Sequence, residues 1–243
     1  MSPYTAVVTG GAHGLGELIV RRLHADGFCV AVADLDAEAA TKLAGELGDA
    51  RGYGVDVSDP EALRRLKDDV VRDFGGVHVL VNNAARTRSI PLLEITADEL
   101  AAVMAVNFTG TFTACQVFGT HFARQGYGRI VNMASLAGQN GGTATGGHYA
   151  SSKGAVLTAT KVFARELAPH GVTVNAVSPG PQDSPVVRSI VGEDRLDEYT
   201  RTIPVGRLGD PAFVARMVAL LASADAASVT GACWDANGGL YLR

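Results

Sequence analysis

Short runs of apolar residues alternate with longer stretches of helical periodicity along the chain. Most of the short runs are apolar at consecutive positions, which is typical of strands buried on both faces of a parallel sheet. The predicted strands are residues 5–9, 29–33, 52–55, 77–81, 129–133, 172–177 and 232–235. The predicted helices are residues 15–26, 37–47, 60–74, 97–124, 149–168 and 211–223. Two of them have start signals, Ser58-Asp59-Pro60-Glu61 and Thr96-Ala97-Asp98-Glu99.

This alternation predicts a doubly wound α/β fold, in which helices cover both faces of a parallel seven-stranded sheet. No repeat, low-complexity tract or linker interrupts the pattern, so we expect residues 1–243 to form one domain. Residues 179–208 break the rhythm. That segment is long and carries four prolines, and we predict that it forms a mobile lid.

Composition and charge narrow the possible partners. Apolar residues make up 47% of the 243 residues and charged residues 19%, so the chain can bury a large core. The formal charge is −4 and no basic run is present. Both observations argue against nucleic acid or an anionic membrane as the main partner.

The cysteines and the apolar segments bear on the compartment. Cys29, Cys115 and Cys233 are scattered and form neither a metal-ligand spacing nor a disulfide framework, so we expect a reducing compartment and no metal site. The first residues run straight into a strand pattern, without the charged and apolar regions of a signal peptide. No segment approaches the roughly 18 apolar residues that span a bilayer. We therefore expect a soluble cytoplasmic protein.

A glycine-rich loop, Thr9-Gly10-Gly11-Ala12-His13-Gly14-Leu15-Gly16, follows the first predicted strand and opens the first helix. Glycines in this pattern allow a tight turn, close approach of the backbone to a pyrophosphate, and tight packing of helix on strand. The alternative is a simple turn, but the position at the first strand–helix junction favours a nucleotide site. The residues expected to contact the nucleotide here are Gly10, His13, Gly14, Leu15 and Gly16.

Asp34 closes the second strand, 18 residues after Gly16. A carboxylate there can accept hydrogen bonds from the adenosine ribose and would repel a 2′-phosphate, which predicts NAD(H) rather than NADP(H). No arginine stands near the loop to hold such a phosphate; His13 and Asp34 occupy the expected places. The alternative for Asp34 is a turn or cap residue, although Asp36 is better placed for capping.

Two further strand ends are candidates for cofactor contact. Asp56 ends the third strand and could contact the adenine amino group, although a turn residue ahead of Ser58 is nearly as good an interpretation. Asn82-Asn83-Ala84-Ala85 ends the fourth strand, where small residues let the backbone lie against a cofactor. The cofactor contacts expected from these strand ends are Asp56, Val57, Asn83, Ala84 and Ala85.

Tyr149 and Lys153 are four residues apart, a spacing that places both side chains on one face of a helix. An ammonium group beside a phenol stabilises phenolate, so we expect the pKa of Tyr149 to fall below its ordinary value of about 10. Tyr149 is then a candidate general acid and base. The alternatives are a core aromatic residue and a solvated lysine; the glycine-rich loop in the same chain favours the catalytic interpretation.

Taken together, these motifs resemble the single-domain short-chain dehydrogenase/reductase family of the Tyr-x-x-x-Lys type, over essentially the whole chain. The resemblance implies a Rossmann-type doubly wound sheet and hydride transfer with a nicotinamide cofactor. The motifs that carry it, in order, are the glycine loop, Asp56, Asn82-Asn83-Ala84, Asn107, Ser135, Tyr149 with Lys153, Asn175-Ala176-Val177-Ser178-Pro179-Gly180, and Pro204-Val205-Gly206-Arg207-Leu208-Gly209.

The resemblance assigns four catalytic roles. It implies that Tyr149 donates a proton to the carbonyl oxygen in reduction and acts as base in oxidation. Lys153 would lower the pKa of the tyrosine and hold the nicotinamide ribose. Ser135, at the end of the fifth strand, would stabilise charge on the substrate oxygen. Asn107, within the long fourth helix, would position a water between Lys153 and solvent. Taken singly, Ser135 as a strand-end cap and Asn107 as a helix-kink residue are the simpler interpretations.

The resemblance also places Pro179 and Gly180 beside the nicotinamide and Ser184 at its carboxamide, where the family often has threonine. Ala85 stands in place of a usual glycine, and Ser135 and Tyr149 are 14 residues apart, one more than the commonest spacing. The family further implies a homotetramer, in which the helices carrying Asn107 and Tyr149 pack against partner helices.

The substrate is expected beyond the carboxyl ends of the strands, among residues 86–93, 136–148 and 180–199. The middle segment is uncharged until His148, which predicts an open, neutral pocket. Three arginines in these segments could bind an anion, although solvated rim residues are the simpler interpretation. These arginines are Arg86, Arg88 and Arg188.

Three functions remain open at this point. Asp34 favours an NAD(H)-dependent oxidoreductase acting on a secondary alcohol or ketone, such as a sugar, steroid or hydroxyacyl compound. The alternative is an NADPH-dependent 3-oxoacyl-[acyl-carrier-protein] reductase; such enzymes tend to carry basic residues where this chain has Gly126 and His170. A second alternative is a non-catalytic NAD(H)-binding regulator, against which the presence of Tyr149 and Ser135 argues.

Overall fold

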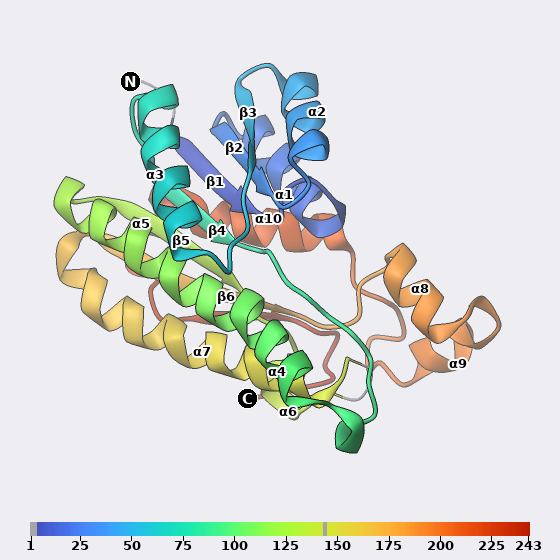
Figure 1. Ribbon diagram of the computed structural model, residues 1–243. Helices are drawn as coiled ribbons and strands as arrows, with labels where there is room; N and C mark the ends of the chain where they lie inside the picture. Colours follow the sequence, from blue (N-terminus) through green and yellow to red (C-terminus); the bar gives the residue numbers. More distant parts are fainter. Residues whose placement is uncertain (1–3, 143–144) are drawn as a thin grey trace.

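A sheet of seven parallel strands forms the centre of a computed structural model that describes residues 4–142 and 145–243. The strand order is β3-β2-β1-β4-β5-β6-β7 (Figure 1). Its winding reverses at β1, which pairs with both β2 and β4. In such sheets, ligands bind outside the carboxyl ends of the strands at this reversal. The strands are β1 (Thr5–Thr9), β2 (Cys29–Asp34), β3 (Ala50–Gly54), β4 (Val79–Asn82), β5 (Gly128–Met133), β6 (Val172–Pro179) and β7 (Cys233–Ala236).

Helices cover both faces of the sheet, which confirms the predicted doubly wound α/β class. On one face lie α1 (Gly14–Ala25), α2 (Ala37–Leu47) and α10 (Pro211–Ala222). On the other lie α3 (Pro60–Phe74), α5 (Thr111–Gln125) and α7 (Gly147–Leu167). The shorter helices are α4 (Ala97–Met104), α6 (Ala137–Asn140), α8 (Pro185–Val191) and α9 (Leu196–Arg201). Short 3₁₀ turns occupy Leu92–Glu94, Ala168–His170, Glu193–Arg195 and Ala224–Ser228.

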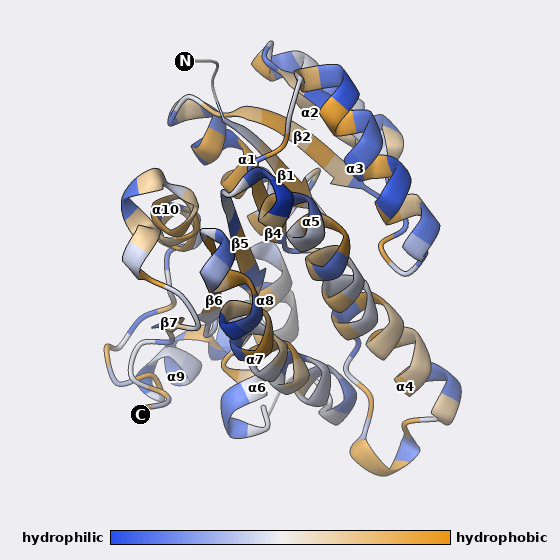
Figure 2. Ribbon diagram, turned by 90° about the vertical axis from the view of Figure 1, so that its left-hand side faces the viewer, coloured by the Kyte–Doolittle hydropathy of each residue, from blue (hydrophilic) through white to orange (hydrophobic). Residues whose placement is uncertain are grey.

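The apolar strands are buried on both sides, as the consecutive apolar pattern predicts. In β1, Ala6 and Val8 pack under α1 and α10, whereas Val7 packs toward α3 and α5. All three are fully buried. Figure 2 shows the result: the central strands are hydrophobic, and the surrounding helices alternate between hydrophobic and hydrophilic residues.

Most element ends agree with the predictions to within two residues. The helices predicted at 37–47 and 60–74 have these bounds, with Asp36 and Asp59 as side-chain N-caps. The third strand starts two residues early, where Ala50 pairs with Val30, and ends at Gly54, which pairs with Asp34 at the end of β2. Asp56 therefore lies in the loop after β3 and not at the end of the strand.

The predicted helix 97–124 is continuous but not uniformly α-helical. A π-helical segment, Ala105–Gly110, joins α4 to α5 and contains Asn107. Such π segments are often found at functional sites. By length and composition this helix, Ala97–Gln125, could cross a membrane, so the expectation that no segment qualifies is wrong. Phe118 and Phe122 of its second half are fully buried in the core.

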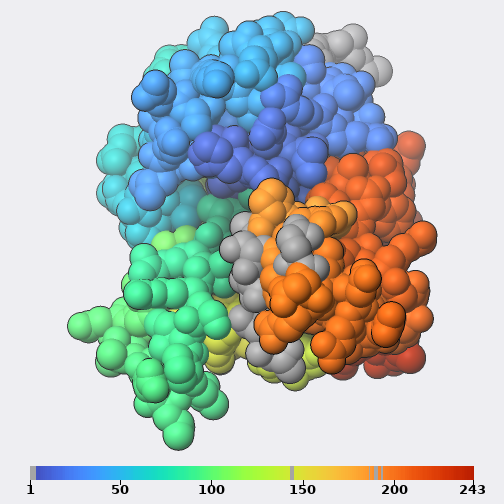
Figure 3. Space-filling model, turned by 90° about the vertical axis from the view of Figure 1, so that its right-hand side faces the viewer, coloured from blue at the N-terminus to red at the C-terminus, as the bar shows by residue number. Residues whose placement is uncertain are grey.

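The segment predicted as a lid contains two helices, α8 and α9. Ser184 caps α8 by accepting from the N–H of Val187, and Pro185 occupies the first turn. Serine before proline is a helix-start signal that the sequence analysis did not use. Figure 3 shows this segment, in orange, on the face where N-terminal residues, in blue, and the residues after β4, in green, also lie.

Residues 1–3, which bear on the predicted absence of a signal peptide, lie outside the described residues. So do residues 143–144 of the predicted pocket segment 136–148. All three cysteines are free thiols.

Candidate active site

The loop between β1 and α1 has the backbone shape that a pyrophosphate requires. Gly10 and Gly14 have positive φ values of 60° and 54°, and a Cβ on Gly16 would lie 1.9 Å from the carbonyl oxygen of Gly10. His13 is the N-cap residue of α1, but its side chain does not cap the helix. The N–H groups of the first turn are therefore left for an anion, which the helix dipole also favours.

Asp34 and Asp36, at the end of β2, have different hydrogen-bond partners. Asp36 accepts from the N–H of Ala39 at 3.0 Å and caps α2, as the sequence suggested. Asp34 braces the glycine loop: one carboxylate oxygen accepts from the N–H of Ala12 at 3.0 Å, and the other from the N–H of Asp36 at 3.1 Å. Each oxygen keeps a further lone pair for a ribose hydroxyl. His13 lies over the same corner, 3.4 Å from Asp36.

Asp56 stabilises the turn in which it lies. Its carboxylate accepts from both the N–H and the hydroxyl of Ser58, at 2.9 and 2.7 Å, which is the turn role weighed against adenine contact. Asp56 and Val57 nevertheless line the same groove as Asp34. Behind them, Val57 packs so tightly on the π-helical segment that a Cβ on Gly110 would lie 2.7 Å from its carbonyl oxygen.

The loop after β4 is tied to the glycine loop by Thr9. The hydroxyl oxygen of Thr9 accepts from the N–H groups of Asn83 and Ala84, at 3.1 and 3.2 Å. The side chain of Asn83 donates to the carbonyl oxygen of Gly10 at 2.8 Å. A groove of about 610 Å³ runs between these loops. Its lining includes Gly10, His13, Asp34, Asp56, Val57, Asn83, Ala84, Ala85 and Arg86. The expectation that no arginine stands near the nucleotide loop is therefore wrong, because the loop after β4 brings Arg86 to the same groove. The described residues thus fit the adenosine half of a dinucleotide.

Ser135, Tyr149 and Lys153 line a second pocket, of about 330 Å³. Pro179 and Gly180, the predicted nicotinamide contacts, line it as well. Its outer wall is neutral and formed by Leu136, Ala137, Asn140, Gly142, Thr145, Val187, Val191 and Tyr199, in agreement with the neutral pocket predicted from the sequence. Leu15 and Asn83 link this pocket to the nucleotide loops. Ser184 is the N-cap of α8.

Burial dominates the proton equilibria of Tyr149 and Lys153. Removal from water raises the pKa of Tyr149 above its ordinary value, and the hydroxyl of Ser135 offsets part of this rise. Burial lowers the pKa of Lys153 to about 8. The ammonium nitrogen lies 5.7 Å from the centre of the tyrosine ring and donates to the carbonyl oxygen of Met133 at 2.6 Å. The expected fall in the pKa of Tyr149 is therefore wrong for this structure, because desolvation of the phenolate outweighs any help from Lys153.

Asn107 is fully buried and all its amide hydrogens are used. Its side chain accepts from the N–H of Arg86 at 2.7 Å and donates to the carbonyl oxygen of Arg86 at 2.9 Å. It also donates to the hydroxyl of Ser152, at 3.0 Å. Asn107 thus clamps the loop after β4 to the helix that carries Tyr149. The water expected beside Asn107 stays a prediction.

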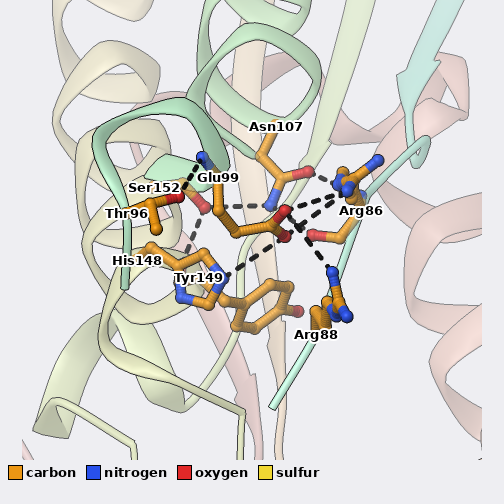
Figure 4. Close-up of polar contacts among 8 residues, drawn as sticks. All are labelled: Arg86, Arg88, Thr96, Glu99, Asn107, His148, Tyr149 and Ser152. Atoms are coloured by element: carbon orange, nitrogen blue, oxygen red, sulfur yellow. Dashed lines mark hydrogen bonds and ion pairs between the residues drawn. The ribbon is translucent and has the colours of Figure 1, made fainter. Parts of the chain in front are cut away.

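One cluster beside the site was missed by sequence reasoning. Glu99 of α4 faces Arg86 and Arg88, and on its other side the ring of His148 (Figure 4). The sequence marked Glu99 only as part of a helix-start motif, and its N–H does donate to the hydroxyl of the N-cap Thr96 at 3.2 Å. Its carboxylate, however, contacts Arg86, Arg88 and His148, which are distant in sequence. A helix-start motif does not predict such contacts.

The arginines considered as anion ligands all have carboxylate partners. Arg86 and Arg88 face Glu99, and Arg188 pairs with Asp183 at 2.7 Å. This agrees with the simpler interpretation as rim residues. Within residues 4–142 and 145–243, no group of three or more His, Cys, Asp or Glu side chains is arranged to hold a metal ion.

Comparison with known proteins places this site in a family. Residues 10–241 match the family model described as enoyl-(acyl carrier protein) reductase. With the sheet order and the motif sequence above, this shows that the chain belongs to the short-chain dehydrogenase/reductase family, as the resemblance implied. Members are oxidoreductases that act on CH–OH or ketone groups of small molecules with nicotinamide cofactors.

Three relatives show the range of chemistry nearby. The chain is 41% identical to 4-formylbenzenesulfonate dehydrogenase of Comamonas testosteroni, over 98% of each chain. It is 35% identical to a 3-oxoacyl-[acyl-carrier-protein] reductase of Vibrio cholerae, over 98% of this chain and 97% of the relative. It is 38% identical to (3R)-3-hydroxyacyl-CoA dehydrogenase of Mus musculus, over 98% and 96%.

Proposed function

We propose that this protein is an NAD(H)-dependent oxidoreductase that interconverts a ketone and a secondary alcohol, within one domain and with Tyr149 as general acid and base. The observation that carries the proposal is the shared pocket: Ser135, Tyr149 and Lys153 line one cavity that Leu15 and Asn83 connect to the glycine loop. A cofactor spanning both would bring its reactive ring to the tyrosine.

The residues of the pocket have the free hydrogen-bonding capacity that this reaction needs. A bound nicotinamide supplies or accepts the hydride. The hydroxyl oxygen of Ser135 accepts from the N–H of Ala137 at 3.1 Å, and its hydrogen, which faces Tyr149, can turn to the substrate oxygen. Lys153 uses one of its three hydrogens on Met133, which leaves two for a ribose. Tyr149 donates its hydroxyl proton to the substrate oxygen in reduction and takes it back in oxidation.

Tyr149 enters the reductive reaction as a phenol. Tyrosine holds its proton at neutral pH, burial raises the pKa of Tyr149 further, and a general acid must start protonated. Bound oxidised cofactor would add a positive charge beside the ring and favour the phenolate that oxidation requires.

Asp34 supports NAD(H) as the cofactor. Its carboxylate is fixed by two backbone N–H groups at the edge of the nucleotide groove, where a 2′-phosphate would meet it. Replacing Asp34→Asn keeps the size of the side chain and removes the charge, together with one of the two bonds from backbone N–H groups. We expect NADPH to gain about tenfold relative to NADH in a binding titration, the effect of roughly 1.4 kcal/mol of lost repulsion. Asp36→Asn is the matched control, because asparagine also caps helices well.

The titration also decides the cofactor itself. Wild-type protein that binds NADPH more tightly than NADH contradicts the role given to Asp34. That result would favour the second candidate, an NADPH-dependent 3-oxoacyl thioester reductase. Its support is the name of the relative in Vibrio cholerae and the uncharged pocket wall.

Turnover tests the reaction. A panel of ketones, aldehydes, 3-oxoacyl thioesters and their alcohols is assayed with NADH or NADPH, or with NAD⁺ or NADP⁺. The (3R)-3-hydroxyacyl-CoA and 4-formylbenzenesulfonate relatives set the first compounds to try. Tight dinucleotide binding without turnover on the panel would contradict the enzyme and favour the non-catalytic regulator.

Assembly and location complete the proposal. We place the protein in the cytoplasm as a homotetramer built through helix Ala97–Gln125 and α7, and Val162 on α7 is an exposed apolar side chain available for such contact. Light scattering on the purified protein checks this; a monomeric mass would contradict it.

A further inference from the structure

Glu99 holds the centre of a charge cluster beside the catalytic pocket (Figure 4). Its side chain is 12% exposed, and its carboxylate lies 3.0 Å from Nη2 of Arg86, 3.9 Å from Nη1 of Arg88 and 3.8 Å from Nε2 of His148. One half-buried carboxylate therefore faces two permanent cations and an imidazole. The imidazole of His148 is fully buried, whereas both guanidinium groups are exposed to water.

The groups around Glu99 belong to the two halves of the proposed site. Arg86 lines the nucleotide groove together with Ala84 and Ala85. His148 directly precedes Tyr149, at the start of α7. Glu99 itself lies on α4 and lines neither the groove nor the catalytic pocket. Glu99 therefore connects the loop after β4, the cofactor loop, to α7, the helix that carries Tyr149. It does so without lining the groove or the pocket.

The ring of His148 is buried beside the carboxylate of Glu99. Its side chain is fully buried, and neither ring nitrogen has a hydrogen-bond partner among the described residues. Buried polar groups without partners are rare and costly, and each calls for an explanation. The carboxylate of Glu99 lies 3.8 Å from Nε2, and the dashed line in Figure 4 joins them.

Asn107 supplies a second, independent hold on the same loop. It binds both backbone groups of Arg86, whereas Glu99 binds the side chain of Arg86. The hydrogen bonds from Asn107 fix the backbone position of the loop, and the ion pair with Glu99 fixes the orientation of the Arg86 side chain. Loss of Glu99 would leave the clamp in place, so the loop should loosen rather than unfold.

We propose that Glu99 is a positioning residue: through Arg86 and His148 it keeps the cofactor loop and the start of α7 at the spacing that hydride and proton transfer require. The proposal rests on the proposed function for its kinetic consequence. Its structural consequence, a more mobile loop and helix start, does not depend on turnover.

The test begins with Glu99→Gln, which keeps the shape and removes the charge. We expect the Kd of NADH to rise about fivefold and kcat/KM to fall by a similar factor, within the range of couplings between neighbouring residues. The control is Glu46→Gln, which breaks an ion pair of 2.6 Å with Arg21 far from the site and should change neither constant. If folded Glu99→Gln has the Kd of NADH and the kcat/KM of wild type, the proposal is overturned. The same holds if these two constants are unchanged and only the thermal midpoint of unfolding falls.

Double-mutant cycles separate the two arms. Arg86→Met keeps the backbone clamp and most of the side-chain length, so Glu99→Gln added to it should weaken NADH binding less than it does in wild type, because only the His148 arm is left to lose. For the other arm, His148→Gln keeps a donor near the position of Nε2, whereas His148→Asn does not. We expect His148→Asn to weaken NADH binding more than His148→Gln. Full additivity of Glu99→Gln with both Arg86→Met and His148→Asn contradicts the proposal.

Hydrogen exchange keeps the test independent of the proposed function. In Glu99→Gln, peptides covering residues 84–95 and 145–153 should exchange faster than in wild type or in Glu46→Gln. If wild-type protein binds neither NADH nor NADPH, the proposed function fails, and hydrogen exchange alone decides the role of Glu99. Equal exchange in the three proteins overturns it.

Discussion

The two halves of the site are built in different ways. The nucleotide half consists mainly of backbone: two glycines with positive φ, an uncapped helix start, and N–H groups bound by Asp34 and Thr9. The catalytic half consists of side chains from the loop after β5, the π-helical segment and α7, with Glu99 of α4 beside them, and these meet over long sequence distances. The first half tolerates little change of shape, whereas the second depends on the chemistry of single groups.

The largest expected effect removes the chemistry and leaves the nucleotide half intact. Tyr149→Phe deletes only the hydroxyl that transfers the proton, so kcat should fall by roughly 10²–10⁴-fold. NADH should bind as in wild type, because the glycine loop, Asp34 and Lys153 are unchanged. Steady-state kinetics and a binding titration measure the two quantities.

A second tyrosine provides the control for this change. Tyr127→Phe also removes one hydroxyl, but from a half-buried ring stacked on Tyr4 and away from both pockets. It should leave kcat unchanged. Activity of Tyr149→Phe within tenfold of wild type contradicts the proton-transfer role.

The reverse experiment breaks the nucleotide half. In Gly16→Ala the new Cβ would stand 1.9 Å from the carbonyl oxygen of Gly10, so the loop must move. We expect NADH binding to weaken about 100-fold or more, together with a loss of roughly 1–3 kcal/mol in the free energy of unfolding from overpacking. Isothermal titration and chemical denaturation check both.

Gly45→Ala is the matched substitution elsewhere. Gly45 lies within α2, and a Cβ there meets no described atom within 4 Å. Because glycine is the poorer helix former, this variant should be more stable than wild type by roughly 0.5–1 kcal/mol and should bind NADH normally. Normal NADH binding by Gly16→Ala would show that the loop adapts and that the distinction between the two halves is wrong.

The same distinction explains what the sequence could predict. The glycine loop, the N-caps Asp36 and Asp59, and the doubly apolar strands are local patterns, and the structure has them where they were expected. Each is fixed by neighbours within a few residues. Local spacing also brought out Tyr149 and Lys153, which do line one pocket.

What the sequence did not reveal depends on distant neighbours. Glu99 lies 13 residues from Arg86 and 49 from His148, and nothing in the helix-start motif says which way its carboxylate turns. The pKa of Tyr149 was predicted to fall from one neighbour at i+4, but burial, a property of the assembled fold, raises it. The π-helical segment likewise packs against a distant part of the chain, the loop after β3, which its own sequence does not indicate.

The smallest effect concerns Lys153, which both halves share. Its pKa in the fold is about 8, below the value of about 10.4 in an unfolded chain, so the unfolded state binds more protons between these pH values. Stability must then rise with pH from about 8 to about 10.4, because raising the pH removes the buried charge. Below pH 8 the full destabilisation by that charge is present.

Lys153→Met removes this titration and isolates its contribution. Between pH 7.5 and 9.5 wild type should gain up to about 2 kcal/mol of unfolding free energy relative to Lys153→Met, since one pKa unit corresponds to roughly 1.4 kcal/mol. Lys161→Met, an exposed lysine on the same helix, should follow wild type throughout. A wild type that runs parallel to Lys153→Met across this range would show that Lys153 keeps an ordinary pKa. Its ammonium would then be better solvated, and closer to a stabiliser of the Tyr149 phenolate, than the buried geometry indicates.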